Sequence, residues 1–207
     1  MTFGEMQTKV RLKINEATSA FFSDDDIQNA INDGFAEMAD ATEYFEREAM
    51  VPLIKRHTYY DLSLILPDTF LSPRRIYNPR TSKWLVPTTP RELDKEWAQW
   101  ETVDGEPEKY FLRGNWWLGV FPRPTKDSEG LRLVYTAIPE DMSDDSDEPD
   151  FPREFHEGLI AFSMSDLMAQ QKEPKKALQY WASYKDYETR FQAYVEGRTK
   201  LAGTRLL

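Results

Sequence analysis

The 207-residue sequence contains no cysteine and only two histidines. Without thiols the chain has no disulfides, no thiolate nucleophile and no cysteine ligands for zinc. His57 lies in a strand-like run and His156 at a predicted helix start, where we expect a surface residue rather than a general base. Neither a Walker pattern nor a dinucleotide fingerprint is present, so no phosphate-binding loop is predicted. We therefore expect no enzyme, no catalytic or metal-binding residues and no cofactor.

Long apolar runs and excess positive charge are also missing. No segment approaches the roughly 18 apolar residues of a membrane span, and Met1–Glu5 lacks the features of a signal peptide. The 26 Lys and Arg are outnumbered by 36 Asp and Glu, which gives a net charge of -10. Because affinity for phosphates comes from basic residues, non-specific binding of nucleic acid is disfavoured. We expect a soluble protein made in the cytoplasm, with no membrane partner.

Apolar residues spaced three and four apart predict two helices at the N-terminal end. The first carries its stripe from Phe3 to Phe21 and starts with a capping box at Thr2. The second begins after the N-cap Ser23 and extends to about Phe45. The short link between them makes the two helices antiparallel neighbours.

Two further helices are predicted at the C-terminal end. Pro152 opens a helix that is apolar nearly all round, which is typical of a central, buried helix. After Pro174 a fourth helix places Leu178 and several aromatic residues on one side. Residues 1–48 and 151–197 are thus expected to form a four-helix bundle lobe.

Residues 49–139 are interpreted as a β-rich insertion between the helices. Frequent prolines exclude long helices, apart from a short one capped by Thr89. Three strand-like runs follow: Lys109–Arg113, Trp116–Phe121 and Leu131–Tyr135. The Gly114-Asn115 turn between the first two favours a hairpin. We predict a single α+β domain, in which a four-helix bundle carries an inserted antiparallel β meander or small sheet.

Residues 140–150 contain seven acidic residues, no basic residue and almost no apolar one. Such a segment cannot fold alone, and we interpret it as an exposed acidic linker that faces a channel or a partner. The candidate residues are Asp141, Asp144, Asp145, Asp147, Glu148 and Asp150. A calcium site is disfavoured, because the glycine and glutamate of an EF-hand loop are missing. Another hypothesis is a small acidic regulator that binds a basic partner through this segment.

Four of the six tryptophans lie between residues 97 and 117: Trp97, Trp100, Trp116 and Trp117. With nearby acids such as Asp104 and Glu106, they suggest an alternative function, a carbohydrate-binding module or an enzyme that uses the tryptophan cluster. The competing interpretation is that these rings fill the core between sheet and helix.

Residues 198–207 form a predicted C-terminal tail that is basic at first and then apolar, without an acid. Such an end stays disordered in water unless a partner orders it. The candidate docking residues are Arg198, Lys200, Leu201, Arg205, Leu206 and Leu207.

Three segments of the chain stand in a recognisable order. The first, Phe22–Gly34, starts the second helix. The second comprises Leu93–Trp100, Gly105–Tyr110 and Val120–Pro124 of the middle region. The third, Phe151–Ala161, opens the closing pair of helices with a Pro-x-x-aromatic-His pattern. In this order they resemble the head-to-tail adaptor (connector) proteins of tailed bacteriophages.

The resemblance implies a structural virion protein at the head-tail junction. It implies a homo-oligomeric ring, typically a dodecamer, that joins the portal protein to the tail or nozzle proteins and lines the DNA exit channel. DNA would pass through without specific binding, since an acidic conduit lets the genome slide. The C-terminal residues named above are then candidates for docking on the portal.

Overall fold

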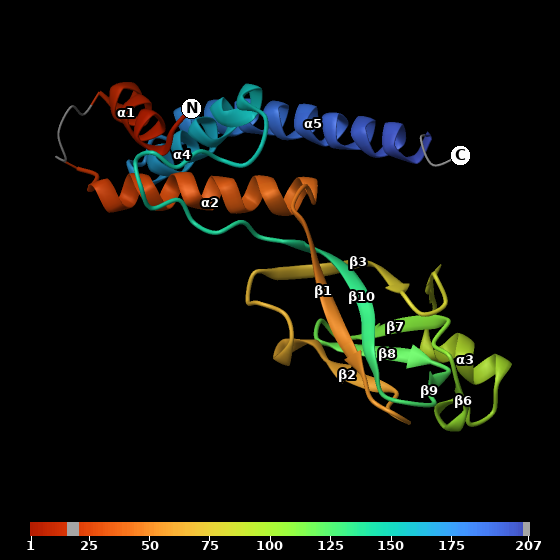
Figure 1. Ribbon diagram of the computed structural model, residues 1–207. Helices are drawn as coiled ribbons and strands as arrows, with labels where there is room; N and C mark the ends of the chain where they lie inside the picture. The colour runs from red at the N-terminus through yellow and green to blue at the C-terminus, as the bar shows by residue number, and fades with distance from the viewer. Residues whose placement is uncertain (16–20, 205–207) are drawn as a thin grey trace. The chain divides into compact units, whose positions relative to one another are not determined.

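The computed structural model describes residues 1–15 and 21–204, and the chain divides into two compact units (Figure 1). Met1–Tyr44 and Pro139–Leu207 form one unit, called here the helical unit. Phe45–Ile138 form the other, called the β unit. The chain enters and leaves the β unit at neighbouring positions, because the Ala137 amide donates to the Phe45 carbonyl at 2.9 Å.

Two capped helices begin the helical unit, α1 (Phe3–Ile14) and α2 (Asp24–Thr42). Both start with the capping boxes predicted from the sequence, in which the side chains of Thr2 and Ser23 accept from backbone amides three residues on. The first helix is shorter than predicted, because Asn15 adopts a left-handed conformation (φ 62°) that ends it. Residues 16–20 of the predicted helix lie outside the described residues.

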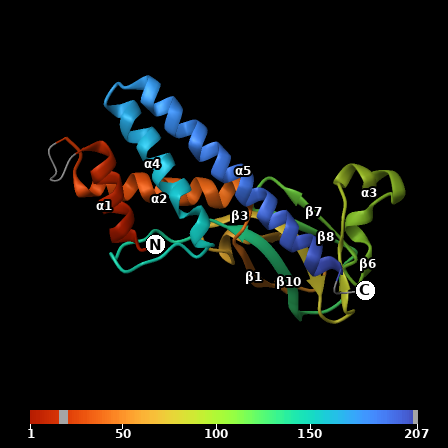
Figure 2. The same ribbon diagram turned by 90° about the horizontal axis from the view of Figure 1, so that it is seen from above.

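The central helix of this unit is α4 (His156–Gln170), which follows a short 3-10 helix, η3 (Arg153–Phe155). It contacts α1, α2 and α5 (Pro174–Thr204). Buried residues lie on all its sides, as predicted: Gly158, Leu159, Ile160, Ala161, Ser163, Met164, Leu167 and Met168. The helices α4 and α5 form an antiparallel hairpin that crosses α2 obliquely (Figure 2). An aligned four-helix bundle is therefore not confirmed.

The β unit contains ten strands among the described residues. They are β1 (Glu46–Leu53), β2 (Tyr59–Asp61), β3 (Phe70–Asn78), β4 (Lys83–Trp84), β5 (Val86–Pro87), β6 (Asp104–Gly105), β7 (Lys109–Arg113), β8 (Trp117–Phe121), β9 (Arg123–Pro124) and β10 (Ser128–Ala137). Sheet A has the order β1-β10-β3-β4, sheet B has the order β2-β8-β7-β5, and β6 pairs with β9. Most neighbours are antiparallel, and the α+β class is confirmed.

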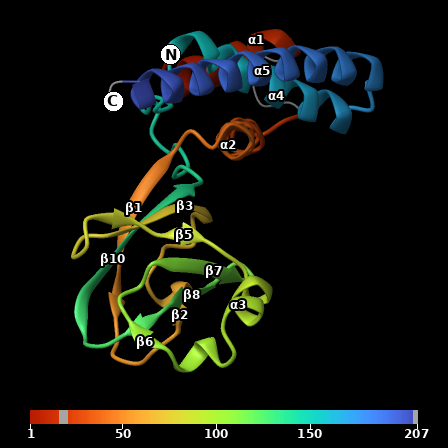
Figure 3. The same cartoon turned by 90° about the vertical axis from the view of Figure 1, so that its right-hand side faces the viewer.

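Two cores stabilise the β unit, one on each face of sheet B. The main core lies between the two sheets and includes Val51, Tyr60, Ile76, Tyr110, Leu118, Val120, Leu131 and Leu133. The smaller core lies under the helix α3 (Pro90–Glu96) and the 3-10 helix η2 (Trp100–Thr102), and consists of Leu93, Trp100, Phe111 and Phe121. Figure 3 shows α3 beside β7 and β8. Tyr110 and Phe111, successive residues of β7, face the main core and the smaller core respectively, because neighbouring side chains of a strand point to opposite faces.

The predicted meander is correct in its hairpin and wrong in its third strand. Strands β7 and β8 pair across the turn at Gly114, as expected. The third run, Leu131–Tyr135, lies in β10 and pairs with β1 and β3 of sheet A instead of with β8. Pro122 and Pro124 interrupt the chain after β8, because proline has no amide hydrogen to continue a ladder. The chain thus leaves sheet B before β10 begins.

Candidate functional site

The acidic segment, residues 140–150, lies against the helices of its own unit. The Phe3 amide at the start of α1 donates to the Asp147 carbonyl at 2.7 Å. The Asn32 side chain of α2 donates to the Met142 carbonyl (3.0 Å) and accepts from the Met142 amide (3.1 Å). The Met142 side chain is buried. The segment is therefore a strap that is fixed to the helical unit by hydrogen bonds.

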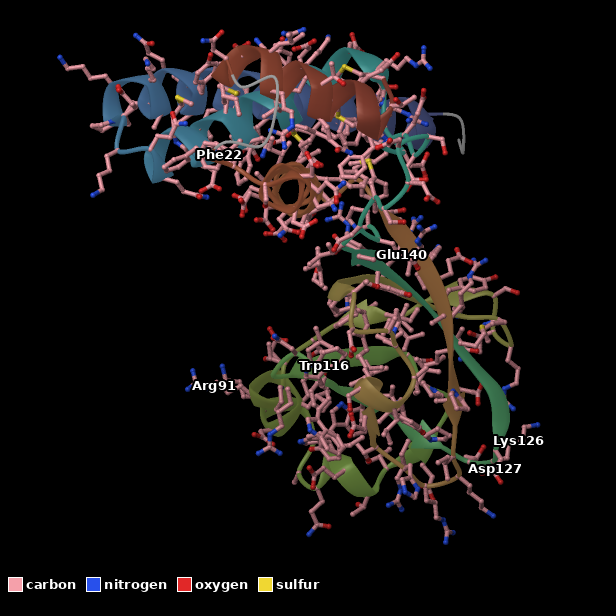
Figure 4. All side chains as sticks on the ribbon, turned by 90° about the vertical axis from the view of Figure 1, so that its left-hand side faces the viewer. Phe22, Arg91, Trp116, Lys126, Asp127 and Glu140 are labelled. Carbon is pink, nitrogen blue, oxygen red and sulfur yellow. The ribbon has the colours of Figure 1, made fainter. Side chains whose placement is uncertain are left out.

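Most carboxylates of the acidic segment are nevertheless exposed. The exposed acids are Glu140 (labelled in Figure 4), Asp141, Asp144, Asp145, Glu148 and Asp150. Asp147 instead accepts from the amides of Asp144 and Ser143, both at 2.9 Å, and these bonds lower the pKa of its carboxyl. Glu148 pairs with Arg153 at 2.8 Å. Within residues 1–15 and 21–204, no group of three or more His, Asp and Glu side chains is placed to hold a metal ion.

The two histidines differ in burial, and the prediction for His156 was wrong. Only 1% of His156 is exposed, and its Nε2 lies 3.0 Å from the Phe151 carbonyl oxygen. Burial lowers the pKa of the imidazole, because a charged ring would lose its hydration. His57 is exposed on the β unit. The Pro-x-x-aromatic-His pattern thus helps to build the core where α4 begins.

The end of the α4–α5 hairpin carries a compact basic surface. Lys172 adopts a left-handed conformation (φ 61°), and its amide donates to the Ala169 carbonyl at 3.0 Å. Pro174, at the first position of α5, completes the reversal. We define the hairpin-end surface as Lys172, Lys175, Lys176, Leu178 and Trp181.

Leu178 was expected on the buried side of α5, yet 67% of it is exposed. The buried stripe of this helix runs through Ala177, Tyr184 and Phe191, which are seven residues apart. Leu178 stands one position, or about 100°, from that stripe. Trp181 is 39% exposed. The hairpin-end surface therefore combines lysines with apolar side chains that water can reach.

A second exposed surface covers one face of sheet A. Arg132, Tyr77 and Trp84 stand opposite one another on β10, β3 and β4. The Arg132 guanidinium lies 4.9 Å from the Tyr77 ring centroid, and the Arg75 guanidinium lies 4.5 Å from that of Trp84. Arginine and large aromatic residues are enriched where proteins bind one another. This surface was not predicted from the sequence, although alternate residues of short strands carry it.

The four tryptophans of the predicted cluster do not form one platform. Trp100 is buried in the smaller core, whereas Trp116 (labelled in Figure 4) packs against the main core. The other two are about half exposed. Asp104 and Glu106, the acids predicted to accompany them, form ion pairs with arginines. These residues are therefore not arranged as one sugar-binding platform.

A cavity of about 580 Å³ opens beside Trp100 in the β unit. The Tyr59 hydroxyl donates to Glu101 at 2.6 Å, and the Trp100 indole donates to Asp94 at 2.9 Å. Burial and the Glu101 carboxylate raise the pKa of Tyr59 to about 12. Both acids are thus already used in holding the aromatic residues of the wall.

Helix α5 does not end at Gly197, where the sequence predicted its end, and continues into the predicted tail. The Arg198 guanidinium lies 3.4 Å from the Tyr44 hydroxyl oxygen and 5.8 Å from the Tyr194 ring centroid. Of the other docking candidates, Lys200 and Leu201 fall within α5, and Arg205, Leu206 and Leu207 lie outside the described residues. Arg198 is therefore already engaged within the helical unit.

The exposed features of the described residues are a charged strap, a basic hairpin end and an aromatic sheet face. Such features are typical of a protein that contacts other macromolecules. The chain belongs to the SU10 adaptor protein family, whose model matches residues 1–204. The predicted resemblance to bacteriophage head-to-tail adaptors is confirmed. No curated protein matches the chain. Within the described residues, no helix is both long and apolar enough to cross a membrane.

Proposed function

We propose that the protein forms a homo-oligomeric ring in the virion, at the head-tail junction, where it joins the portal to the tail and lines the DNA exit channel. The observation that carries this proposal is the match of the adaptor family over residues 1–204. A match of this extent covers both units, so the whole chain would serve the adaptor role. A ring of twelve copies agrees with the resemblance found in the sequence.

The charge of the chain supports a channel that does not retain DNA. The net charge is -10, and the excess of acids is not balanced by a long basic stretch. Because binding to DNA requires basic residues that displace counterions, an acidic lining lets the genome pass. The purified protein should therefore show no measurable retention of duplex DNA at about 50 mM salt, a condition that favours such binding. Tight binding there would contradict the proposed lining.

We place portal docking at residues 198–207, the basic and apolar end of the chain. The test is the variant Leu201→Asp with Leu206→Asp, introduced into a phage that depends on the plasmid-borne protein. The variant should keep the circular dichroism of the wild type and be absent from portal-bearing heads. Leu201→Ile with Leu206→Ile is the matched control and should be incorporated. Normal incorporation of the aspartate variant would overturn the docking assignment.

Ring formation is tested by imaging the purified protein in negative stain, alone and mixed with portal. Closed rings, or density that caps the portal, are the expected result. If the wild-type protein neither binds portal nor occurs in particles, the adaptor role proposed here is wrong. Imaging with portal is essential, because some subunits form a ring only when they bind to the portal that templates it.

A further inference from the structure

The lysines of the hairpin-end surface make only one ion pair within the described residues. Lys172 and Lys175 are exposed and make no ion pair with any other part of the described chain. Lys176 has only a distant partner, Glu173, at 4.0 Å. Exposed pairs at such distances contribute little, so all three ammonium groups are available to another acidic surface.

Apolar side chains flank these lysines and can be covered by a partner. Leu178 is 67% exposed, and Trp181 is 39% exposed. The Trp181 ring rests on Tyr184 and Phe162, with centroids 5.3 Å and 6.2 Å away, so its position is supported from below. Tryptophan is enriched among the residues that carry most of the binding energy of interfaces.

The matching acidic surface lies on the same unit. Residues 140–150 hold seven carboxylates and no basic residue. The whole chain has a net charge of -10. In two perpendicular views, the strap preceding α4 lies on one side of the helical unit and the α4–α5 turn on the opposite side (Figures 2 and 3). One copy therefore cannot join its own two surfaces. Unlike surfaces on opposite sides of a subunit are what a heterologous, ring-closing contact requires.

We infer that the acidic segment of one copy docks on the hairpin-end surface of the next copy around the ring. This inference rests on the ring of the proposed function and names the residues that join its subunits. Opposite charges set the register and the rate of association, while burial of Leu178 and Trp181 supplies apolar area. The contact should weaken as salt rises, because exposed charges are screened.

Charge reversal tests the pairing. One variant carries Lys172→Glu, Lys175→Glu and Lys176→Glu. The other carries Glu140→Lys, Asp141→Lys, Asp144→Lys and Asp150→Lys, which changes the net charge of residues 140–150 from -7 to +1. Each alone places like charges across the contact and should reduce the copies per particle more than about tenfold, since like charges cost several kcal/mol. When both variants are expressed together, subunits can alternate with every contact attractive, and incorporation should recover. Normal incorporation of either single variant, or no recovery from the mixture, would overturn the inference.

Crosslinking provides a readout on assembled particles. The chain has no cysteine, so Ser146→Cys in the acidic segment with Gln179→Cys beside the hairpin-end surface introduces the only two thiols. A short bis-maleimide should convert the protein in particles into a ladder of covalent multimers, detected with an antibody against the chain. The control, Ser146→Cys with Ala193→Cys, moves the second thiol about 21 Å along α5 and should give no ladder.

The outcomes separate this inference from the proposed function. Particles that contain normal amounts of the Ser146→Cys, Gln179→Cys protein but give no ladder would refute the contact and leave the adaptor role intact. Absence of the wild-type protein from particles would refute the adaptor ring and this contact with it. A ladder that extends beyond the dimer supports both.

Discussion

Replacing Gly119 by alanine should disrupt the smaller core of the β unit. A Cβ atom at this position would lie 2.1 Å from Cζ and 2.4 Å from Cε2 of Phe111, far inside van der Waals contact. The Phe111 ring cannot simply move away, because it packs edge-on against Trp100 (5.4 Å) and Tyr59 (5.9 Å). We expect Gly119→Ala to lower the free energy of unfolding by about 3 kcal/mol, at the upper end of overpacking effects.

A double-mutant cycle isolates the steric cause. Phe111→Ala alone should cost about 3–5 kcal/mol, because it removes a buried ring. In that background the new methyl group has room, so Gly119→Ala should add less than about 1 kcal/mol, which gives a coupling of about 2 kcal/mol. Gly114→Ala is the matched control, since nothing lies within 4 Å of its Cβ and only its positive φ (65°) is strained. It should cost about 1–2 kcal/mol in either background.

The assay is urea unfolding followed by tryptophan fluorescence, which reports on this core because Trp100 belongs to it. The circular dichroism of α-helices provides a second probe that is dominated by the helical unit. Costs of Gly119→Ala and Phe111→Ala that add within about 0.5 kcal/mol would refute the reasoning, because residues in contact are expected to couple.

Three further predictions concern single residues. The lowered pKa of buried His156 means that the unfolded chain binds a proton more readily than the folded one; stability should therefore fall as the pH drops below 6.5, and His156→Gln should flatten that dependence in urea midpoints, whereas an unchanged slope would argue against it. Ser23→Ala should cost about 1 kcal/mol by removing the N-cap of α2. It should also return the pKa of Asp26, now lowered chiefly by the Ser23 hydroxyl, toward its ordinary value in an NMR titration, while Ser23→Thr should leave both properties nearly unchanged. Trp84→Ala should cost about 1–2 kcal/mol by removing the stacking of two guanidinium groups, and Trp84→Phe should retain part of it; an effect of zero on urea unfolding would show that the stack does not stabilise sheet A.

The helix starts could be predicted from the sequence, because capping is a local interaction. Thr2, Ser23 and Thr89 each bind a backbone amide three residues on, and the structure has all three caps. The end of α1 was less predictable, since Asn15 stops the helix inside an apolar stripe that continues along the sequence.

The strand partners could not be predicted in the same way. The run Leu131–Tyr135 resembles the next strand of a meander, yet it lies between β1 and β3, whose residues are far away in the sequence. Only the competition between complete sheets decides such a pairing. The buried position of His156 likewise depends on Phe151 and on the helices packed around it.

The candidate surfaces were predictable in composition and not in placement. Exposed acids in residues 140–150 follow from their charge, but the bonds between Asn32 and Met142 that fix the segment connect positions 110 residues apart. The hairpin-end surface was not predicted, because Leu178 has the sequence spacing of the apolar stripe of α5. A shift of one residue on a helix turns a core position outward.

The two connections of the β unit leave sheet A at the same end, where Glu46 stands opposite Thr136. Hydrogen bonds of an antiparallel pair run perpendicular to the strands. A force that pulls the two units apart therefore draws β1 and β10 in the same direction, so the bonds that join these two strands carry little of it. The load passes instead to the bonds between β10 and β3, which lie across the direction of the strands and must break together rather than in sequence.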